Sequence, residues 1–147
     1  MTDTTHTGHC LCGAIRFEFS GKPLFVAHCH CNDCRRNTGA AVATFVGVKT
    51  EQLRWLSNPP SAFASSPGVR RTFCKACGGA ITYEGDKFPG EIHINIGVLD
   101  RPGDHVPKAH VWASQKLGWL HIRDAAPRFP RIGRGDGEPS FDEEGRS

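Results

Sequence analysis

Seven cysteines in a chain of 147 residues constrain the fold more than any other feature of the sequence. They form three short clusters, and an odd number of thiols cannot close completely into disulfides within one chain. The clusters are Cys10-Leu11-Cys12, Cys29-His30-Cys31-Asn32-Asp33-Cys34 and Cys74-Lys75-Ala76-Cys77. No βαβ pattern surrounds the last pair, which argues against a thioredoxin-like redox motif. Metal binding is therefore the expected role of these thiols.

The length and composition predict one globular domain without a membrane segment. Charged residues make up 22% of the chain and hydrophobic residues 38%, and no run of 18 apolar residues occurs. The first residues lack the basic and apolar regions of a secretory signal, so we expect a cytoplasmic protein. The formal net charge of +3 is too small for a nucleic-acid signature. We therefore expect neither nucleic-acid nor membrane partners.

Much of the chain alternates apolar and polar residues with a period of two, which indicates short β-strands. Ile15, Phe17 and Phe19 are one example, and Ile92, Ile94 and Ile96 are another. Further strands are expected at 24–28, 42–48, 53–56, 70–73, 81–83 and 109–112. Turn residues separate these segments, which favours antiparallel sheets, and only 32–37 is expected to form a turn of helix. Arg70 and Arg71 are assigned to a solvated strand face.

Composition also suggests how the chain is divided. Residues 1–6 are predicted to be an N-terminal tail, and 7–126 to be the folded domain. Residues 127–147 are rich in glycine and charge and have little to bury, so they are predicted to be a flexible C-terminal tail.

The first and third clusters share a local pattern that suits one closed zinc site. Gly13 follows Cys12, and Gly78 follows Cys77. A glycine after the second ligand lets the turn adopt a positive φ and direct backbone N–H groups at the sulfur. We therefore expect Cys10, Cys12, Cys74 and Cys77 to bind one structural zinc.

The middle cluster then offers three thiolates and no fourth cysteine. Cys29 and Cys31 point to one side of an extended segment, with His28 and His30 on the other, and Cys34 can fold back to join the sulfurs. Three protein ligands with an open position are typical of a catalytic zinc. Two alternatives stay open: reduced core thiols, and a second structural site that a histidine closes. The candidate histidines for that site are His30, His93, His105 and His110.

Two arginines follow the third cysteine of this cluster. A guanidinium group can bind a carboxylate with two parallel hydrogen bonds, so Arg35 and Arg36 are candidates for binding an acidic substrate. The alternative is a pair of solvated charges.

These three clusters, in this order, resemble the glutathione-dependent formaldehyde-activating enzyme family, whose domain is also called GFA/CENP-V-type. The resemblance begins at Gly8-His9-Cys10-Leu11-Cys12-Gly13 and extends through the other two clusters to Pro107-Lys108-Ala109-His110-Val111-Trp112. It covers about residues 7–121.

The resemblance implies a β-tent fold, with mainly antiparallel sheets organised around the structural zinc and little helix. It implies two zinc ions per chain, with Cys10, Cys12, Cys74 and Cys77 holding the structural one and Cys29, Cys31 and Cys34 holding the catalytic one. It also implies carbon–sulfur lyase chemistry on a small thiol such as glutathione and a small aldehyde or its S-hydroxyalkyl adduct, as in S-(hydroxymethyl)glutathione synthase. The alternative is a non-catalytic binding module stabilised by zinc, because a fold does not fix a function.

Overall fold

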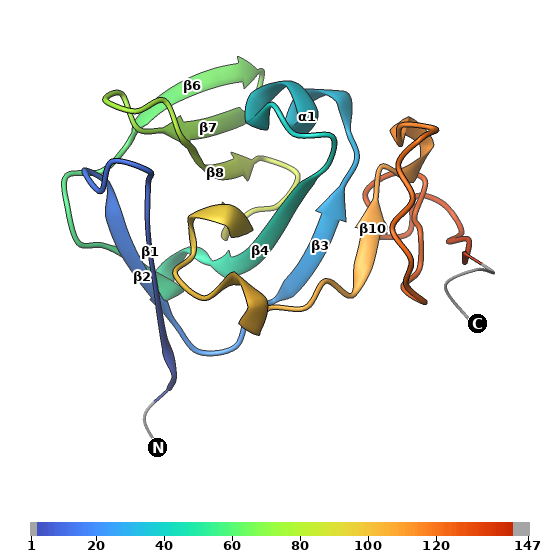
Figure 1. The fold of residues 1–147 in the computed structure, drawn as a ribbon, viewed down its shortest axis with the longest axis horizontal. Coiled ribbons are helices and arrows are strands. Elements are labelled where there is room, and N and C mark those ends of the chain that lie inside the picture. Colours follow the sequence, from blue (N-terminus) through green and yellow to red (C-terminus); the bar gives the residue numbers. More distant parts are fainter. Residues whose placement is uncertain (1–2, 143–147) are drawn as a thin grey trace. The chain divides into compact units, whose positions relative to one another are not determined.

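The computed structural model describes residues 3–142, which form a mainly β structure with little helix (Figure 1). The predicted fold class is confirmed. The strands among these residues are β1 (Thr5–His9), β2 (Arg16–Ser20), β3 (Phe25–Cys29), β4 (Ala43–Lys49), β5 (Leu53–Trp55), β6 (Ser61–Ser66), β7 (Val69–Phe73), β8 (Ala80–Gly85), β9 (Glu91–Asn95) and β10 (Ala109–Val111). The helical segments are α1 (Asn32–Thr38) and the short 3-10 segments η1 (Thr50–Gln52), η2 (Ile96–Val98), η3 (Pro102–Asp104) and η4 (Ala113–Gln115). None of the helices in residues 3–142 combines the length and the apolar character that crossing a lipid bilayer requires.

The chain forms two compact units. Unit 1 contains the residues up to Phe25 together with Val46–His105, and unit 2 contains Val26–Phe45 together with the residues from Val106 onward. Strand β4 begins in unit 2 and continues in unit 1. The first and third cysteine clusters belong to unit 1, and the middle cluster belongs to unit 2.

Unit 1 contains a small antiparallel sheet with the strand order β1-β2-β5. The predicted alternation in β2 is present, because Phe17 and Phe19 are fully buried while Arg16 is exposed. Gly8 of β1 lies opposite Phe17, and it is also bridged to Leu99, which follows η2. This sheet places the first cysteine cluster directly after β1.

The other strands of unit 1 run antiparallel from β6 through β7 and β8 to β9. Between β7 and β8, the hydroxyl oxygens of Thr72 and Thr82 are 2.6 Å apart and buried. The assignment of Arg71 to a solvated face is wrong, because this residue is only 5% exposed. Its guanidinium carbon lies 5.0 Å from the centre of the Tyr83 ring, and its Nε donates a hydrogen bond to Ser65. A guanidinium can be buried here because an aromatic face and a hydroxyl replace its water.

Unit 2 contains a parallel pair of strands, β3 and β10. Their register pairs Ala27 with Ala109, His28 with His110, and Cys29 with Val111. The pair is extended beyond Cys29, since the N–H of His30 donates to the carbonyl of Val111 over 3.0 Å. Strand β3 leads through Cys31 into α1, which matches the helical turn expected at 32–37.

The segment after β10 folds back beside it. The N–H of His110 donates to the carbonyl of Pro127, and the N–H of Phe129 donates to the carbonyl of His110. Arg128 is further bridged to Ser140. At the other end of the chain, β1 begins at Thr5, two residues before the predicted start of the domain. The division of the chain into an N-terminal tail, a folded domain and a C-terminal tail stays a prediction. Residues 1–2 and 143–147, at the ends of the two predicted tails, lie outside the described residues.

Candidate functional site

The first and third cysteine clusters meet in unit 1. The Sγ atoms of Cys10, Cys12, Cys74 and Cys77 all lie within 4.8 Å of one another. The Sγ of Cys12 is 3.6 Å from that of Cys10 and 3.7 Å from that of Cys74. In a tetrahedral site, Zn–S bonds of about 2.3 Å place neighbouring sulfurs about 3.8 Å apart. The spacing of these thiols therefore fits a zinc ion.

Two tight turns of the same kind present these sulfurs. In the first, the N–H of Gly13 donates to the carbonyl of Cys10. In the second, the N–H of Gly78 donates to the carbonyl of Cys74. Gly13 has φ 81° and Gly78 has φ 76°, as predicted from their positions after the second cysteine of each pair. In the first turn, the N–H of Ile15 donates to the Sγ of Cys10 over 3.3 Å, which stabilises a thiolate there.

The four thiols strongly affect one another's ionisation. Burial raises the pKa of Cys10, but the N–H of Ile15 and the neighbouring thiols outweigh burial and lower it to about 6. The N–H of Ala14 lowers the pKa of Cys12, but the other three thiols and burial together outweigh that effect, and the value rises to about 11. One thiolate thus opposes the ionisation of the next. A divalent cation at the centre offsets this repulsion, so the donor set suits a metal ion.

The middle cluster forms a second group of sulfurs, in unit 2. The Sγ atoms of Cys29, Cys31 and Cys34 lie within 4.8 Å of one another, and the group has three members among the described residues. Cys29 ends β3, Cys31 is the N-cap of α1, and Cys34 lies in the first turn of that helix. The N–H of Cys34 donates to the Sγ of Cys31 over 3.2 Å. The short helix therefore brings the third sulfur back to the other two, as its spacing predicted.

Charge repulsion is again evident in this group. Contacts with Cys31 and Cys34, together with burial, raise the pKa of Cys29 well above its usual value. Three thiolates at this spacing need a cation to coexist, so these residues also suit a bound metal ion.

The two candidate arginines lie on α1, directly after the third cysteine. Arg36 is exposed, whereas Arg35 is partly buried. The Nε of Arg35 is buried and makes no hydrogen bond within residues 3–142. A buried guanidinium N–H without an acceptor is costly, so Arg35 can gain from an anionic ligand beside it.

None of the four histidines proposed to close the second site joins its three sulfurs within 4.8 Å. In unit 1, the Nε2 of His93 lies 3.0 Å from a carboxylate oxygen of Glu91, and His105 packs against His6 with ring centres 4.8 Å apart. In unit 2, the Nε2 of His30 lies 2.9 Å from the Nδ1 of His110.

Sequence reasoning missed a group of polar side chains in unit 2. His28, His110 and Asp124 place one ligand atom each within 4.8 Å of one another, and Arg128 contacts Asp124 over 2.7 Å. The only signal in the sequence was the pair His28 and His30 on one face of a strand. Nothing in the sequence indicated that a parallel partner strand would add His110 to that face.

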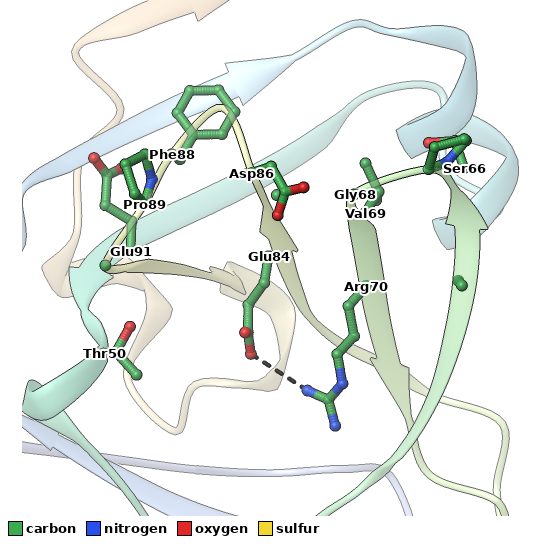
Figure 2. Close-up of a pocket in the computed structure, with 14 residues that line it drawn as sticks. Thr50, Ser66, Gly68, Val69, Arg70, Glu84, Asp86, Phe88, Pro89 and Glu91 are labelled. Atoms are coloured by element: carbon green, nitrogen blue, oxygen red, sulfur yellow. Dashed lines mark hydrogen bonds and ion pairs between the residues drawn. The ribbon is translucent and has the colours of Figure 1, made fainter.

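Unit 1 also carries a groove of about 780 Å³ beside the loops that join β6 to β7 and β8 to β9 (Figure 2). Figure 2 shows Glu84 and Arg70 facing each other from neighbouring strands, with their charged groups 3.4 Å apart. None of the seven cysteines and neither Arg35 nor Arg36 lines this groove. The predicted site residues therefore lie elsewhere.

Comparison with known proteins shows which family has this sequence pattern. The profile of the family described as glutathione-dependent formaldehyde-activating enzyme matches residues 5–115, more than half of the 147-residue chain. The chain belongs to this family. A curated protein of Halomonas elongata, provisionally named a glutathione-dependent formaldehyde-activating enzyme, is 26% identical over 125 residues, which cover 78% of this chain and 79% of that protein.

The fold also occurs in a protein of known crystal structure. A Rhodobacter sphaeroides protein matches with a TM-score of 0.56 and 24% identity, covering 69% of this chain and 97% of that one. This likeness shows the fold alone. Membership of the formaldehyde-activating family rests on the sequence match, which includes all three cysteine clusters.

Proposed function

We propose that this protein is a zinc-dependent enzyme of the carbon–sulfur lyase class that acts on a small thiol and a small aldehyde. Glutathione is the proposed thiol, and formaldehyde is the aldehyde in the name of the family. In the direction of synthesis, the sulfur forms a bond to the carbonyl carbon, and the thiol proton ends on the carbonyl oxygen. The product is an S-hydroxyalkyl adduct, and the reverse reaction returns the thiol and the aldehyde.

The observation that carries this proposal is the group of three sulfurs at the junction of β3 and α1. Cys29, Cys31 and Cys34 would hold the catalytic zinc. With three protein ligands, such an ion offers an open position that stabilises a thiolate at neutral pH. The N–H of Cys34 donates to Cys31 and helps to hold that ligand in place.

Arg35 is proposed to bind a carboxylate of the thiol substrate. It follows Cys34 directly, and its buried Nε lacks an acceptor within the described residues. Glutathione carries two carboxylates, which match the geometry of a guanidinium group. Arg36, which is exposed, is proposed to assist from the solvent side. Orientation of the thiol by these contacts would align its sulfur with the aldehyde.

Cys10, Cys12, Cys74 and Cys77 are proposed to hold a structural zinc. They join the turn after β1 to the turn between β7 and β8, positions more than 60 residues apart in the chain. A metal ion that joins such distant segments stabilises the fold directly. The zinc domain is proposed to be 7–126, and the protein to act in the cytoplasm.

The first test is the metal content of the protein purified with zinc under reducing conditions. We expect two zinc ions per chain in the cysteine clusters. X-ray absorption should find four sulfurs at one of them and three sulfurs with a lighter ligand at the other. If the seven cysteines together bind only one zinc ion, the proposed catalytic site is refuted.

The second test is the initial rate at which glutathione thiol disappears when formaldehyde is added, measured above the spontaneous rate. Cys31→Ser should reduce this rate to the spontaneous value while the four-sulfur site stays filled. A wild-type rate that does not saturate, or one that Cys31→Ser leaves unchanged, would favour the non-catalytic binding module.

Arg35 is tested separately. Because hydrogen bonds to charged groups contribute about 1.5–3 kcal/mol, Arg35→Gln should raise the KM for glutathione roughly 10- to 100-fold with little change in kcat. Arg36→Gln is the matched comparison, with a smaller expected effect because the residue is exposed. Equal KM values for Arg35→Gln and the wild type would refute the role of Arg35.

A further inference from the structure

Strand β3 presents different side chains on its two faces. Successive residues of a strand point to opposite sides, so Cys29 lies on one face while His28 lies on the other, and the extended backbone continues this alternation to His30 and Cys31. The parallel register pairs His110 of β10 with His28, which places both residues on the histidine face. The rings of these two residues are 4.9 Å apart, and those of His30 and His110 are 5.2 Å apart. Three imidazoles thus lie together on the face opposite the cysteines.

We propose that His28, His110 and Asp124 form a third metal site, separate from both cysteine clusters, that binds a divalent first-row transition metal ion. One ligand atom from each residue lies within 4.8 Å of the others. All three residues belong to unit 2. His110 is 1% exposed, and the side chain of Asp124 is 29% exposed, so the group is open to solvent on its carboxylate side.

Both histidines have a partner at Nδ1, and the Nε2 of His110 faces the carboxylate of Asp124, with which it would share a metal ion. The Nδ1 of His28 lies 2.8 Å from the hydroxyl of Thr44. The Nδ1 of His110 lies 2.9 Å from the Nε2 of His30. Histidine ligands typically use one ring nitrogen for the metal and the other for such a partner, which fixes the ring orientation. Both rings therefore have the supporting contacts that metal ligands need, with Nε2 remaining as the ligand atom.

The carboxylate of Asp124 is divided in the same way. Its Oδ1 accepts hydrogen bonds from Arg128 over 2.7 Å and from the N–H of Ala126 over 3.0 Å. Its Oδ2 lies 2.9 Å from the Nε2 of His110, which is also 3.2 Å from Oδ1. Arg128 also donates to the carbonyls of Ile122, Asp124 and Ala126, so the loop that carries the carboxylate is held by its own hydrogen bonds.

The charge of Arg128 has two opposite effects on such a site. It lowers the affinity for a cation, and it helps to keep Asp124 ionised as a ligand. Burial raises the pKa of Asp124, but hydrogen bonds from His110, Ala126 and Arg128 outweigh burial and hold it below its ordinary value. The carboxylate is therefore charged at neutral pH and ready to bind a cation.

The ligand set also selects the class of ion. Two imidazoles and one carboxylate suit Zn²⁺, Co²⁺ or Fe²⁺, whereas Mg²⁺ and Ca²⁺ prefer sites made of oxygen atoms. Binding requires the proton of His110 to move from Nε2 to Nδ1, where the Nε2 of His30 can accept its hydrogen bond. Both rings can stay neutral during this change, with the proton of His30 on its Nδ1.

Cobalt absorption spectroscopy can distinguish this site from the cysteine clusters. The probe is Co²⁺, added to the full-length protein after two equivalents of Zn²⁺ per chain have filled the thiolate clusters, with no zinc left over for the third site. We expect one further equivalent of Co²⁺ to bind, with weak visible bands. The intense near-ultraviolet charge-transfer band of a sulfur ligand should be absent, because the three ligands supply only nitrogen and oxygen.

The decisive variants are His28→Asn and Asp124→Asn, and His121→Asn is the matched control because His121 is exposed and outside the group. Loss of one of three ligands should weaken Co²⁺ binding at least about 10- to 100-fold. The amide of His28→Asn reaches only as far as Nδ1, so it can keep the hydrogen bond to Thr44 while removing Nε2, which separates loss of the ligand from loss of the fold. The proposal is overturned if the wild type binds no additional equivalent of Co²⁺ or if both decisive variants still bind it. A sulfur charge-transfer band would also overturn it.

Discussion

Gly8 offers a sharp test of how closely unit 1 is packed before its first cysteine turn. This glycine lies in β1, two residues before Cys10, and it is buried. A Cβ at this position would lie 2.5 Å from the carbonyl oxygen of Val98 and 2.9 Å from the Cε1 of Phe17, and closer still to the Cζ of that ring. Gly8→Ala therefore forces either a backbone carbonyl or a fully buried aromatic ring to move.

The expected loss of stability follows from these contacts. Overpacking a well-packed core costs about 1–3 kcal/mol, and the upper end applies here because one clashing atom belongs to the backbone. Replacement of glycine by alanine restricts the unfolded chain and returns about 0.4–1 kcal/mol. The net decrease in the free energy of unfolding is therefore about 2 kcal/mol. For a chain of this size, the midpoint of thermal unfolding should fall by about 4–8 °C.

The measurement is urea and thermal unfolding, followed by circular dichroism, with the zinc content of all proteins matched. Gly97→Ala is the control, because Gly97 belongs to the neighbouring η2 and a Cβ there meets nothing within 4 Å. That variant should stay within about 0.5 kcal/mol of wild type. If Gly8→Ala is as stable as Gly97→Ala, the close packing of β1 against η2 and Phe17 is refuted.

Three further predictions concern the cysteine turn, a buried histidine and the metal. Gly13→Ala should lower the free energy of unfolding by about 1–2 kcal/mol, because φ is +81° and an alanine strains the backbone there. No neighbour lies within 4 Å of the added Cβ, so steric clash adds nothing to this cost. Gly13→Asn should cost less, and equal urea midpoints for both variants would contradict this. Burial and the nearby His6 hold the pKa of His105 below 6.5, so the neutral ring stabilises the fold above that pH. This contribution disappears as the pH falls through the lowered pKa. Between about pH 7 and about pH 5, His105→Phe should therefore lose less stability than wild type, and equal slopes would refute the assignment. Removal of metal by a strong chelator under reducing conditions should lower the thermal midpoint, and added zinc should restore it. An unchanged midpoint would contradict a structural metal at Cys10, Cys12, Cys74 and Cys77.

The parts of the structure that follow from local sequence were predictable. The alternation in β2 predicted which of its residues are buried, because successive side chains of a strand point to opposite faces. In β9 the same pattern predicted the burial of Ile92 and Ile94, but His93 and Asn95 on the other face are buried too, and Ile96 lies in η2. The positive φ of Gly13 and Gly78 follows from their place after a cysteine pair. The convergence of Cys34 on Cys29 and Cys31 follows from one turn of helix after an extended segment.

The missed features depend on partners that are distant in sequence. Strands β1 and β6 consist of polar or small residues apart from Phe63, and they are strands because β2 and β7 provide their hydrogen bonds. The burial of Arg71 depends on Tyr83, which the pairing of β7 with β8 places opposite it. No local pattern contains this information.

The position of His110 shows the same limit at the candidate site. As a single residue it was a plausible ligand for the cysteine cluster. The parallel register with β3 places it beside His28, on the face opposite the sulfurs. Asp124 and Arg128 then contribute to this face from the segment that follows, which composition alone marks as polar and irregular.

The two faces of β3 also determine which changes of chain length this protein can accept. An insertion or deletion of one residue within Val26–Cys29 would exchange the sides of all side chains that follow in the strand, so that imidazoles would replace thiols beside α1. An insertion or deletion of two residues would return each side chain to its original face, but it would shift the histidines and the cysteines along β10. The length of β3 therefore fixes the positions of the histidines and of the cysteines at the same time. Within this strand, length variants among relatives should be rare even where single substitutions are common.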